Sequence, residues 1–496
     1  MEEKKSKEQE KTKEYETPED KIVQTHQKVS IGGKEISYTV TTGTMILKEE
    51  AEDEGKSEGE QAKAAVFFVA YTKDGVKDAA KRPITFSFNG GPGSSSVWMH
   101  LGMLGPRRVL LDEQGNPPQP PYQLVNNDYS LLDMTDLVFI DPVSTGYSRA
   151  VPGEKPKEFH DFKKDIESVG EFIRLYTTRN LRWASPKFLI GESYGTTRAA
   201  GLSGYLQERH GFYLNGIMLI SVVLDFQTIR FSIGNDLPFI LYLPSYTATA
   251  WYHGRLDEEL QKDLQAALAE AEAFALGDYT LALMKGATLP EDERAGIVAQ
   301  LARLTGLSPE FIERVDLRIE IHRFVKELMR DERRTVGRLD SRYIGIDRDA
   351  AGENFEYDPS HAATQGAYSA TLNDYVRREL KYESDLPYEI INSRVFPEWQ
   401  YGEHQNKYVY VAETLRKAMS MNPYLKVFVA CGYYDLATPY LATNYTFSHL
   451  ALDDELQGNI AIHYYEAGHM MYVHIPSLAQ LKEELAAFVT EATVQS

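Results

Sequence analysis

Short apolar runs that end in glycine or proline turns recur in both halves of the chain. The clearest are ITFSFNGGPG at 84–93, DLVFIDPVSTG at 136–146, KFLIGESYG at 187–195, GIMLISVVLDF at 216–226 and KVFVACGYYD at 426–435. Runs of this kind are typical of buried, mostly parallel strands. Between two of them lies a stretch with one apolar face at helical spacing, formed by Phe162, Ile166, Val169 and Ile173. This alternation predicts an α/β fold with a mostly parallel central sheet and helices on both faces.

The same patterns divide the chain into four parts. Residues 1–25 are charged and almost without apolar periodicity, so we interpret them as a disordered tail. Residues 26–225 and 401–496 carry the alternation of strands and helices and predict the first and second parts of one core. Residues 226–400 are helical and charged, which predicts an inserted, mainly helical cap. Its clearest amphipathic helices are 256–276 and 308–329.

A G-x-S-x-G pentapeptide, Gly191-Glu192-Ser193-Tyr194-Gly195, directly follows one of the apolar runs and precedes a helical pattern. This context is typical of a nucleophile elbow, in which a strained turn between strand and helix exposes the serine. Small flanking residues suit such a turn because larger side chains would clash. We therefore predict that Ser193 is a catalytic nucleophile in an α/β-hydrolase fold. The alternative is a glycine-rich turn with an inert serine.

A serine hydroxyl needs a neighbouring base, and in this fold an acid and then a histidine follow the serine along the chain. Asp435 stands where a predicted strand must stop before Ala-Thr-Pro, and it is the predicted acid; Asp225, which also follows a strand, is the second choice. His469 opens a turn after the apolar run that begins at residue 460, and it is the predicted base. His463 and His474 are weaker candidates.

The glycine-rich segment Asn89-Gly90-Gly91-Pro92-Gly93 follows another predicted strand. Glycines at this place allow backbone N–H groups to approach a substrate oxygen, where each donor contributes roughly 3–4 kcal/mol. We predict that the N–H groups of Gly91 and Tyr194 form the oxyanion hole. A phosphate-binding loop is the alternative, but GGPGSSS lacks the Lys-Ser/Thr ending of a P-loop.

Composition narrows the possible partners. The 53 lysines and arginines against 73 aspartates and glutamates give a net charge of −20, which disfavours nucleic acids and anionic membranes. No apolar run is long enough to span a membrane. The single cysteine, Cys431, allows no intrachain disulfide, and the N-terminus lacks an apolar signal segment. The sequence as it stands therefore predicts a cytoplasmic protein, or an exported one if a signal peptide has been removed.

Metal-binding motifs such as HExxH or paired CxxC are missing from the sequence, so we expect no metal and no cofactor. The expected partner is a peptide or a small acyl substrate. The sequence gives no indication of the oligomeric state.

Together these segments resemble the serine carboxypeptidase family, in particular the carboxypeptidase Y group. The matching segments, in family order, are FNGGPGSSS (88–96), LGP (104–106), DPVSTGYS (141–148), GESYG (191–195), the strand end at Asp435 and EAGHM (466–470). The resemblance implies removal of one C-terminal amino acid through an acyl-enzyme, without a cofactor. It also implies that Ser193 is the nucleophile, that His469 is the general base and that Asp435 orients this histidine.

The resemblance further implies that Asn89 and Glu192 help to hold the C-terminal carboxylate of the peptide, and we assign Gly90 to the same substrate-binding set. Three positions depart from the family pattern. Phe88 replaces a tryptophan, and Ser94 replaces a cysteine. The glutamate that pairs with Glu192 in the family, just before LGP, is missing, because neither Met103 nor its neighbours are acidic. Candidates to hold the carboxylate instead are Arg107, Arg108, Arg149 and Arg198.

Three functions are compatible with these observations. The first is a serine carboxypeptidase that acts on peptides. The second is a serine esterase, amidase or acyltransferase that uses the same triad on another acyl group. The third is a catalytically inactive binding module, although no triad residue and no oxyanion glycine has been lost.

Overall fold

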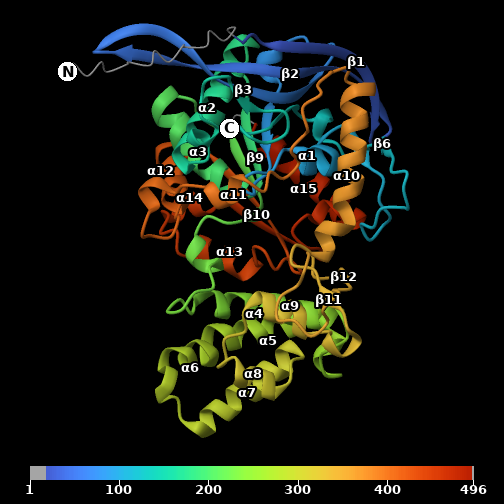
Figure 1. Ribbon diagram of the computed structural model, residues 1–496, viewed down its shortest axis with the longest axis vertical. Coiled ribbons are helices and arrows are strands. Elements are labelled where there is room, and N and C mark those ends of the chain that lie inside the picture. The colour runs from blue at the N-terminus through green and yellow to red at the C-terminus, as the bar shows by residue number, and fades with distance from the viewer. Residues whose placement is uncertain (1–17, 494–496) are drawn as a thin grey trace, which may run out of the picture.

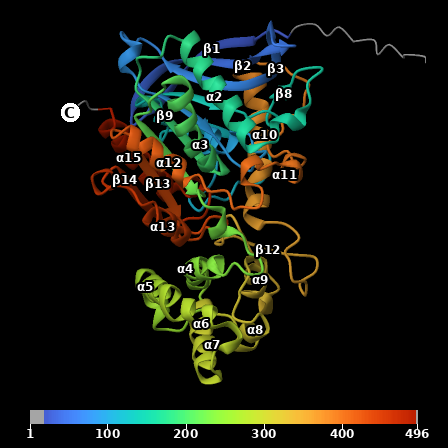
Figure 2. The same ribbon diagram turned by 90° about the vertical axis from the view of Figure 1, so that its left-hand side faces the viewer.

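The computed structural model describes residues 18–493 and has two parts (Figures 1 and 2). A large body contains the central sheet, and a smaller helical lobe extends from it at the bottom of both views. Residues 1–17 of the tail predicted at 1–25 lie outside the described residues. Residues 21–25 of this predicted tail belong to a strand that begins at Lys21. Among residues 18–493, no helix combines the length and apolar character needed to cross a lipid bilayer.

A ten-stranded sheet forms the centre of the body. In spatial order its main strands are β1 (Lys21–Ile31), β2 (Lys34–Asp53), β3 (Lys56–Lys73), β7 (Asp136–Ile140), β4 (Ile84–Phe88), β9 (Lys187–Ser193), β10 (Gly216–Val222), β13 (Lys426–Gly432) and β14 (Ile460–Tyr465). The short β8 (Arg149–Ala150) pairs with β3. The neighbouring strands β7, β4, β9, β10, β13 and β14 run parallel to one another. On the other side of β7, the strands β3, β2 and β1 each pair antiparallel with their neighbours. The predicted mostly parallel sheet is confirmed, and an antiparallel extension adds to it on one side.

Helices cover both faces of this sheet. Those of the body are α1 (Val97–Met99), α2 (Phe162–Arg179), α3 (Tyr194–His210), α10 (Pro359–Arg378), α11 (Val395–Glu398), α12 (Ala412–Met421), α13 (Tyr440–Ser448), α14 (Asp454–Gln457) and α15 (Ile475–Glu491). Consecutive residues of β9 enter different cores: Leu189 shares a buried cluster with Ile166 of α2, and Ile190 shares another with Leu481 of α15. Apolar residues on both faces explain why β9 is a continuous apolar run.

The lobe is built almost entirely of helices (Figure 1). Its elements are α4 (Leu237–Tyr252), α5 (Leu264–Phe274), α6 (Thr280–Lys285), α7 (Glu291–Thr305), α8 (Pro309–Arg314), α9 (Ile321–Glu327) and the paired strands β11 (Thr335–Val336) and β12 (Ile344–Gly345). Asp263 caps α5 by accepting the backbone N–H groups of Gln265 and Ala266. Residues Leu241, Leu301 and Phe324 are fully buried at its centre.

Helix α10 follows the lobe in the chain but belongs to the body. Its residues Tyr368, Leu372 and Tyr375 are buried in the same cluster as Ile190 of β9. The region 226–400, expected to be one inserted cap, is therefore distributed over the lobe and the body. A second small pair of strands, β5 (Arg107–Val109) and β6 (Leu124–Asn126), also lies in the body.

The parallel strands of the body position the candidate site. β4 ends just before Asn89, and β9 ends at Ser193. β13 ends shortly before Asp435, and β14 ends shortly before His469. Because parallel strands bring their carboxyl ends to one edge of a sheet, these segments meet there. This edge faces the lobe (Figure 2).

Candidate active site

Ser193 occupies the sharp turn between β9 and α3. Its φ of 59° and ψ of −129° lie outside the regions that residues with a side chain normally adopt. The flanking glycines are required by space: a Cβ on Gly191 would lie 2.1 Å from the carbonyl oxygen of Gly195, and one on Gly195 would lie 2.7 Å from that of Phe88. The turn thus has the strain and the crowding of a nucleophile elbow, and it leaves Ser193 partly exposed among buried neighbours.

His469 and Asp435 form a buried pair at the ends of two neighbouring strands. The Nδ1 atom of His469 lies 2.7 Å from Oδ2 of Asp435. The carboxylate also accepts the backbone N–H groups of Ala437 at 2.7 Å and Thr438 at 3.0 Å, as well as the Thr438 hydroxyl at 2.7 Å. These bonds fix the carboxylate, which holds Nδ1 of His469 as the donor and leaves Nε2 as the nitrogen that can accept a proton.

Opposing effects act on the pKa of His469. Burial lowers this pKa, but the charge of Asp435 and its hydrogen bond raise it, and the net result is a pKa above the ordinary 6.5. The imidazole therefore holds a proton more firmly than a free histidine does.

The segment between β11 and β12 of the lobe holds both loops of this pair. The carbonyl of Leu339 accepts the backbone N–H of His469 at 2.6 Å, and the carbonyl of Arg338 accepts that of Leu436 at 3.0 Å. The carboxylate of Asp340 accepts the backbone N–H of Gly468 at 3.2 Å. The position of the histidine thus depends on residues 338–340 as well as on the sheet.

The other candidates for the acid and the base have different partners. Asp225 caps a short helical turn by accepting the backbone N–H of Gln227 at 2.9 Å. His463 lies in β14, where its ring stacks on Phe428. His474 contacts the hydroxyl of Ser477 at 2.8 Å. It is Asp435 and His469 that the structure brings into contact.

The glycine-rich loop after β4 packs directly against the elbow. A Cβ on Gly90 would lie 2.5 Å from the backbone nitrogen of Tyr194, so a side chain at Gly90 would separate the two segments. Gly91 has a φ of 106°, which favours glycine. The N–H of Tyr194 belongs to the first turn of α3, where no carbonyl within the helix can accept it.

Asn89 and Glu192 are buried beside this loop. The side-chain oxygen of Asn89 accepts the backbone N–H of Met99 at 3.2 Å, and the hydroxyl of Tyr472 donates to Glu192 at 2.5 Å. Burial raises the pKa of Glu192 to about 7, although the positive charge of His469 and the hydrogen bond from Tyr472 act in the opposite direction.

Tyrosines surround Glu192 on the side where the sequence departs from the family pattern. Met103 is buried, and the adjacent Gly102 lies against two phenols, since a Cβ there would be 2.5 Å from the ring of Tyr472 and 2.6 Å from the hydroxyl of Tyr368. Tyr472 was not predicted from the sequence, because its only signal there is its position three residues after His469.

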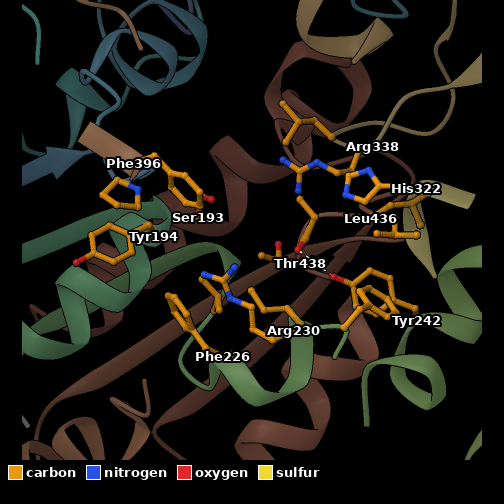
Figure 3. A pocket seen from close by; sticks show the side chains of 18 of the residues that line it. Ser193, Tyr194, Phe226, Arg230, Tyr242, His322, Arg338, Phe396, Leu436 and Thr438 are labelled. Atoms are coloured by element: carbon orange, nitrogen blue, oxygen red, sulfur yellow. Dashed lines mark hydrogen bonds between the residues drawn. The ribbon is translucent and has the colours of Figure 1, made fainter. Parts of the chain in front are cut away.

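Ser193 opens into a cavity of about 500 Å³ between the body and the lobe (Figure 3). Gly91 and Tyr194 also line it. Its other aromatic residues come from both parts of the molecule and are Phe226, Phe231, Tyr242, Phe396 and Tyr401. Its charged or titratable residues are Arg230, Glu320, His322 and Arg338.

None of the four arginines proposed from the sequence lines this cavity within the described part of the chain. Arg107 pairs with Glu379, and Arg198 pairs with Asp165. Arg149 and Arg108 donate to backbone carbonyls. The cavity instead contains Arg230 and Arg338, which no motif in the sequence pointed to.

A serine at the elbow after a central parallel strand, with a buried acid–histidine pair at later strand ends, defines the class of serine α/β-hydrolases. A comparison with protein families identifies the particular family. The chain belongs to the serine carboxypeptidase family, whose model matches residues 56–471. The resemblance seen in the sequence is therefore confirmed.

Known relatives align with part of the chain. Serine carboxypeptidase-like 29 of Arabidopsis thaliana is 30% identical over 175 residues, which are 34% of this chain and 34% of that protein. The pheromone-processing carboxypeptidase KEX1 of Cryptococcus gattii serotype B is 32% identical over 145 residues, 28% of this chain and 20% of that protein. The chain thus aligns with about a third or less of the length of these relatives.

A solved structure extends the similarity to nearly the whole chain. The crystal structure of Kex1(delta)p, a prohormone-processing carboxypeptidase from Saccharomyces cerevisiae, superimposes with a TM-score of 0.56 at 16% identity and covers 91% of each chain. At this identity the two proteins share the fold.

Proposed function

We propose that this protein is a serine carboxypeptidase that removes single C-terminal amino acids from peptides through an acyl-enzyme on Ser193. The observation that carries the proposal is that the elbow serine and Gly91 line one cavity together with Thr438, whose hydroxyl donates to Asp435 of the Asp435–His469 pair. Membership of the serine carboxypeptidase family supports the same reaction.

In the proposed mechanism, the hydroxyl of Ser193 attacks the last peptide carbonyl while Nε2 of His469 takes its proton. Asp435 keeps the imidazole oriented and stabilises its positive charge. The N–H groups of Gly91 and Tyr194 donate to the oxyanion of the tetrahedral intermediate. His469 then protonates the leaving amine. Water next attacks the acyl-enzyme while His469 takes its proton, and that proton passes to the oxygen of Ser193 as the acid product leaves.

We assign the terminal carboxylate of the peptide to the side of Ser193 where Asn89, Gly90 and Glu192 lie. Below a pH of about 7, Glu192 carries a proton and can donate a hydrogen bond to a carboxylate. Above that pH the two negative charges repel each other. Gly90 contributes by the absence of a side chain, which allows the loop to approach Tyr194.

The proposal is tested with three substrates that share one acyl group: an N-blocked dipeptide, its C-terminal amide and an aryl ester. A carboxypeptidase releases the free amino acid from the dipeptide and cleaves the amide much more slowly. Ser193→Ala should abolish turnover of all three. Rapid ester cleavage without release of any amino acid would contradict the proposal and indicate an esterase.

A further inference from the structure

Two arginines enter the cavity beside Ser193 from opposite walls (Figure 3). Arg230 follows β10 and the short turn capped by Asp225. Arg338 belongs to the segment that holds the loops of Asp435 and His469. These residues lie far apart in the sequence, and only the fold brings both guanidinium groups to the same space.

Among the described residues, no carboxylate forms an ion pair with Arg230 or Arg338, whereas other arginines around the lobe, such as Arg255 and Arg318, have such partners. Of the residues that line the cavity, only Glu320 is acidic within the described chain. Its carboxylate already accepts the backbone N–H groups of His322 and Arg323 at the start of α9. Two arginines against one carboxylate give the cavity a net positive charge in a protein whose net charge is −20.

Contacts hold the guanidinium of Arg230 and the backbone of Arg338 in place. The guanidinium carbon of Arg230 lies 5.6 Å from the ring centroid of Phe226, a distance at which a cation is attracted to the ring. The backbone of Arg338 is held at both ends, since its N–H donates to Asp358 at 3.2 Å and its carbonyl accepts from Leu436 at 3.0 Å. A planar guanidinium that is held before binding, as the ring of Phe226 holds that of Arg230, loses little entropy when it binds a carboxylate.

The position of the cavity indicates which part of the substrate meets these arginines. Asn89 and Glu192, assigned above to the terminal carboxylate, do not line the cavity in the described chain. Because the scissile carbonyl must lie over Ser193, a C-terminal residue on that side directs the preceding, acyl residue into the cavity. We propose that Arg230 and Arg338 bind the side-chain carboxylate of this acyl residue, so that peptides with a penultimate glutamate or aspartate are the preferred substrates. This inference rests on the proposed function.

N-benzoyl dipeptides with glutamate, glutamine or lysine before a C-terminal phenylalanine test the preference. We expect kcat/KM for the glutamate peptide to exceed that for the glutamine peptide by about 10- to 100-fold, the range for one or two charge-assisted hydrogen bonds. The lysine peptide should be the poorest. A ratio near one between the glutamate and glutamine peptides in the native protein would overturn the proposal.

Variants of the two arginines locate the preference. In Arg230→Gln, Arg338→Gln and the double variant, the ratio between the glutamate and glutamine peptides should fall towards one. Arg323→Gln is the matched control, because Arg323 is exposed on α9 next to His322 but does not line the cavity; it should keep the native ratio. If the arginine variants keep that ratio but no longer distinguish the free acid from the C-terminal amide, the arginines bind the terminal carboxylate and the proposal is wrong.

A binding measurement separates this inference from the proposed function. N-acetylglutamate has the chemistry of the released acyl product, and it should slow the reaction of Ser193 with a fluorophosphonate. In the native protein, N-acetylglutamine should protect Ser193 at least ten times more weakly than N-acetylglutamate does. In the double arginine variant, the two compounds should protect Ser193 equally. This difference in protection is expected even if the protein cleaves no dipeptide. A failure to cleave dipeptides would refute the carboxypeptidase activity but not the arginine subsite. Equal protection by both compounds in the native protein would refute the arginine subsite.

Discussion

The chemistry of single residues at this site depends on how much water and charge surround them. His469 and Glu192 are both buried, but His469 faces the fully buried carboxylate of Asp435, whereas Glu192 faces mainly the hydroxyl of Tyr472. Burial has the largest single effect on the pKa of His469 and lowers it, but the charge and hydrogen bond of Asp435 and the charge of Glu192 together raise the pKa above its ordinary value. The pKa of Glu192 is raised to about 7 because burial outweighs its hydrogen bond and the charge of His469.

The raised pKa of His469 predicts the acidic limb of the activity profile. A general base acts only when neutral, so kcat/KM should fall as the pH drops through a value above 6.5. Asp435→Asn removes the charge that raises this pKa. We expect the limb to move to lower pH and kcat to fall by about 10⁴-fold. A native limb well below pH 6, measured with a blocked dipeptide, would contradict this account of the base.

The raised pKa of Glu192 predicts a dependence of stability on pH. Because the folded protein binds this proton more tightly than the unfolded chain, the contribution of Glu192 to stability is present below pH 4.5 and is lost as the pH rises to about 7. Glutamine does not titrate, so in the variant Glu192→Gln this contribution to stability does not fall as the pH rises. Relative to the native protein, it should gain up to about 3 kcal/mol in the free energy of unfolding between pH 4.5 and pH 8.

Urea unfolding at several pH values measures this difference. Glu258→Gln, at an exposed position of the lobe, is the control and should follow the native profile. A difference between Glu192→Gln and the native protein that stays constant with pH would show that Glu192 is not a buried titrating group.

At the scale of elements, the loop of His469 is held between the sheet and the segment 338–340. The approach is close: a Cβ on Gly468 would lie 2.5 Å from the Cα atom of Asp340. Asp340 is itself fixed by a buried ion pair with Arg342 at 2.6 Å. Removing the whole region 226–400 would therefore take away support for the histidine as well as one wall of the cavity.

Gly468→Ala tests this dependence. The added methyl group has no room beside Asp340 and should displace the His469 loop, and a shift of about 1 Å can cost roughly 100-fold in rate. Gly458→Ala is the matched control, because no atom lies within 4 Å of a Cβ there. We expect Gly468→Ala to react about 10- to 100-fold more slowly with a fluorophosphonate, whereas Gly458→Ala reacts at the native rate. A native rate for Gly468→Ala would show that the segment 338–340 does not position the base.

The strands at the centre of the sheet could be predicted closely from the sequence, because each is buried on both faces and ends at a glycine or another turn residue. The lobe was less predictable. The helix expected at 308–329 is divided into α8 and α9, since Asp316 and Leu317 adopt positive φ values of 51° and 64°. Apolar periodicity continues across this break, so only tertiary packing determines where the helix ends.

In the candidate site too, local motifs could be predicted from the sequence, whereas features that depend on tertiary packing could not. Ser193 and Gly91 lie in local motifs whose conformation the sequence itself requires, and the order along the chain pointed to Asp435 and His469. Arg230 and Arg338 lie in no motif, and their common position exists only after the lobe and the body have folded. The sequence therefore indicated where a nucleophile would lie but not which charges surround the substrate.

At the scale of the whole molecule, the body carries the groups proposed for catalysis and the lobe completes the cavity above them. Ser193, Gly91 and Thr438 belong to the body, whereas Tyr242 and His322 come from the lobe. We expect reactivity to depend on the body and on the segment 338–340, and selectivity to depend on the body and the whole lobe. The proposed catalysis in this molecule requires that Ser193 is the nucleophile.

Covalent labelling identifies the nucleophile. After reaction with a fluorophosphonate, mass spectrometry of the intact and digested protein should find one adduct, on the peptide that contains Ser193. Ser193→Ala should remain unlabelled, and Ser420→Ala, at an exposed position, should be labelled like the native protein. An adduct on a different residue, or undiminished labelling of Ser193→Ala, would contradict the account.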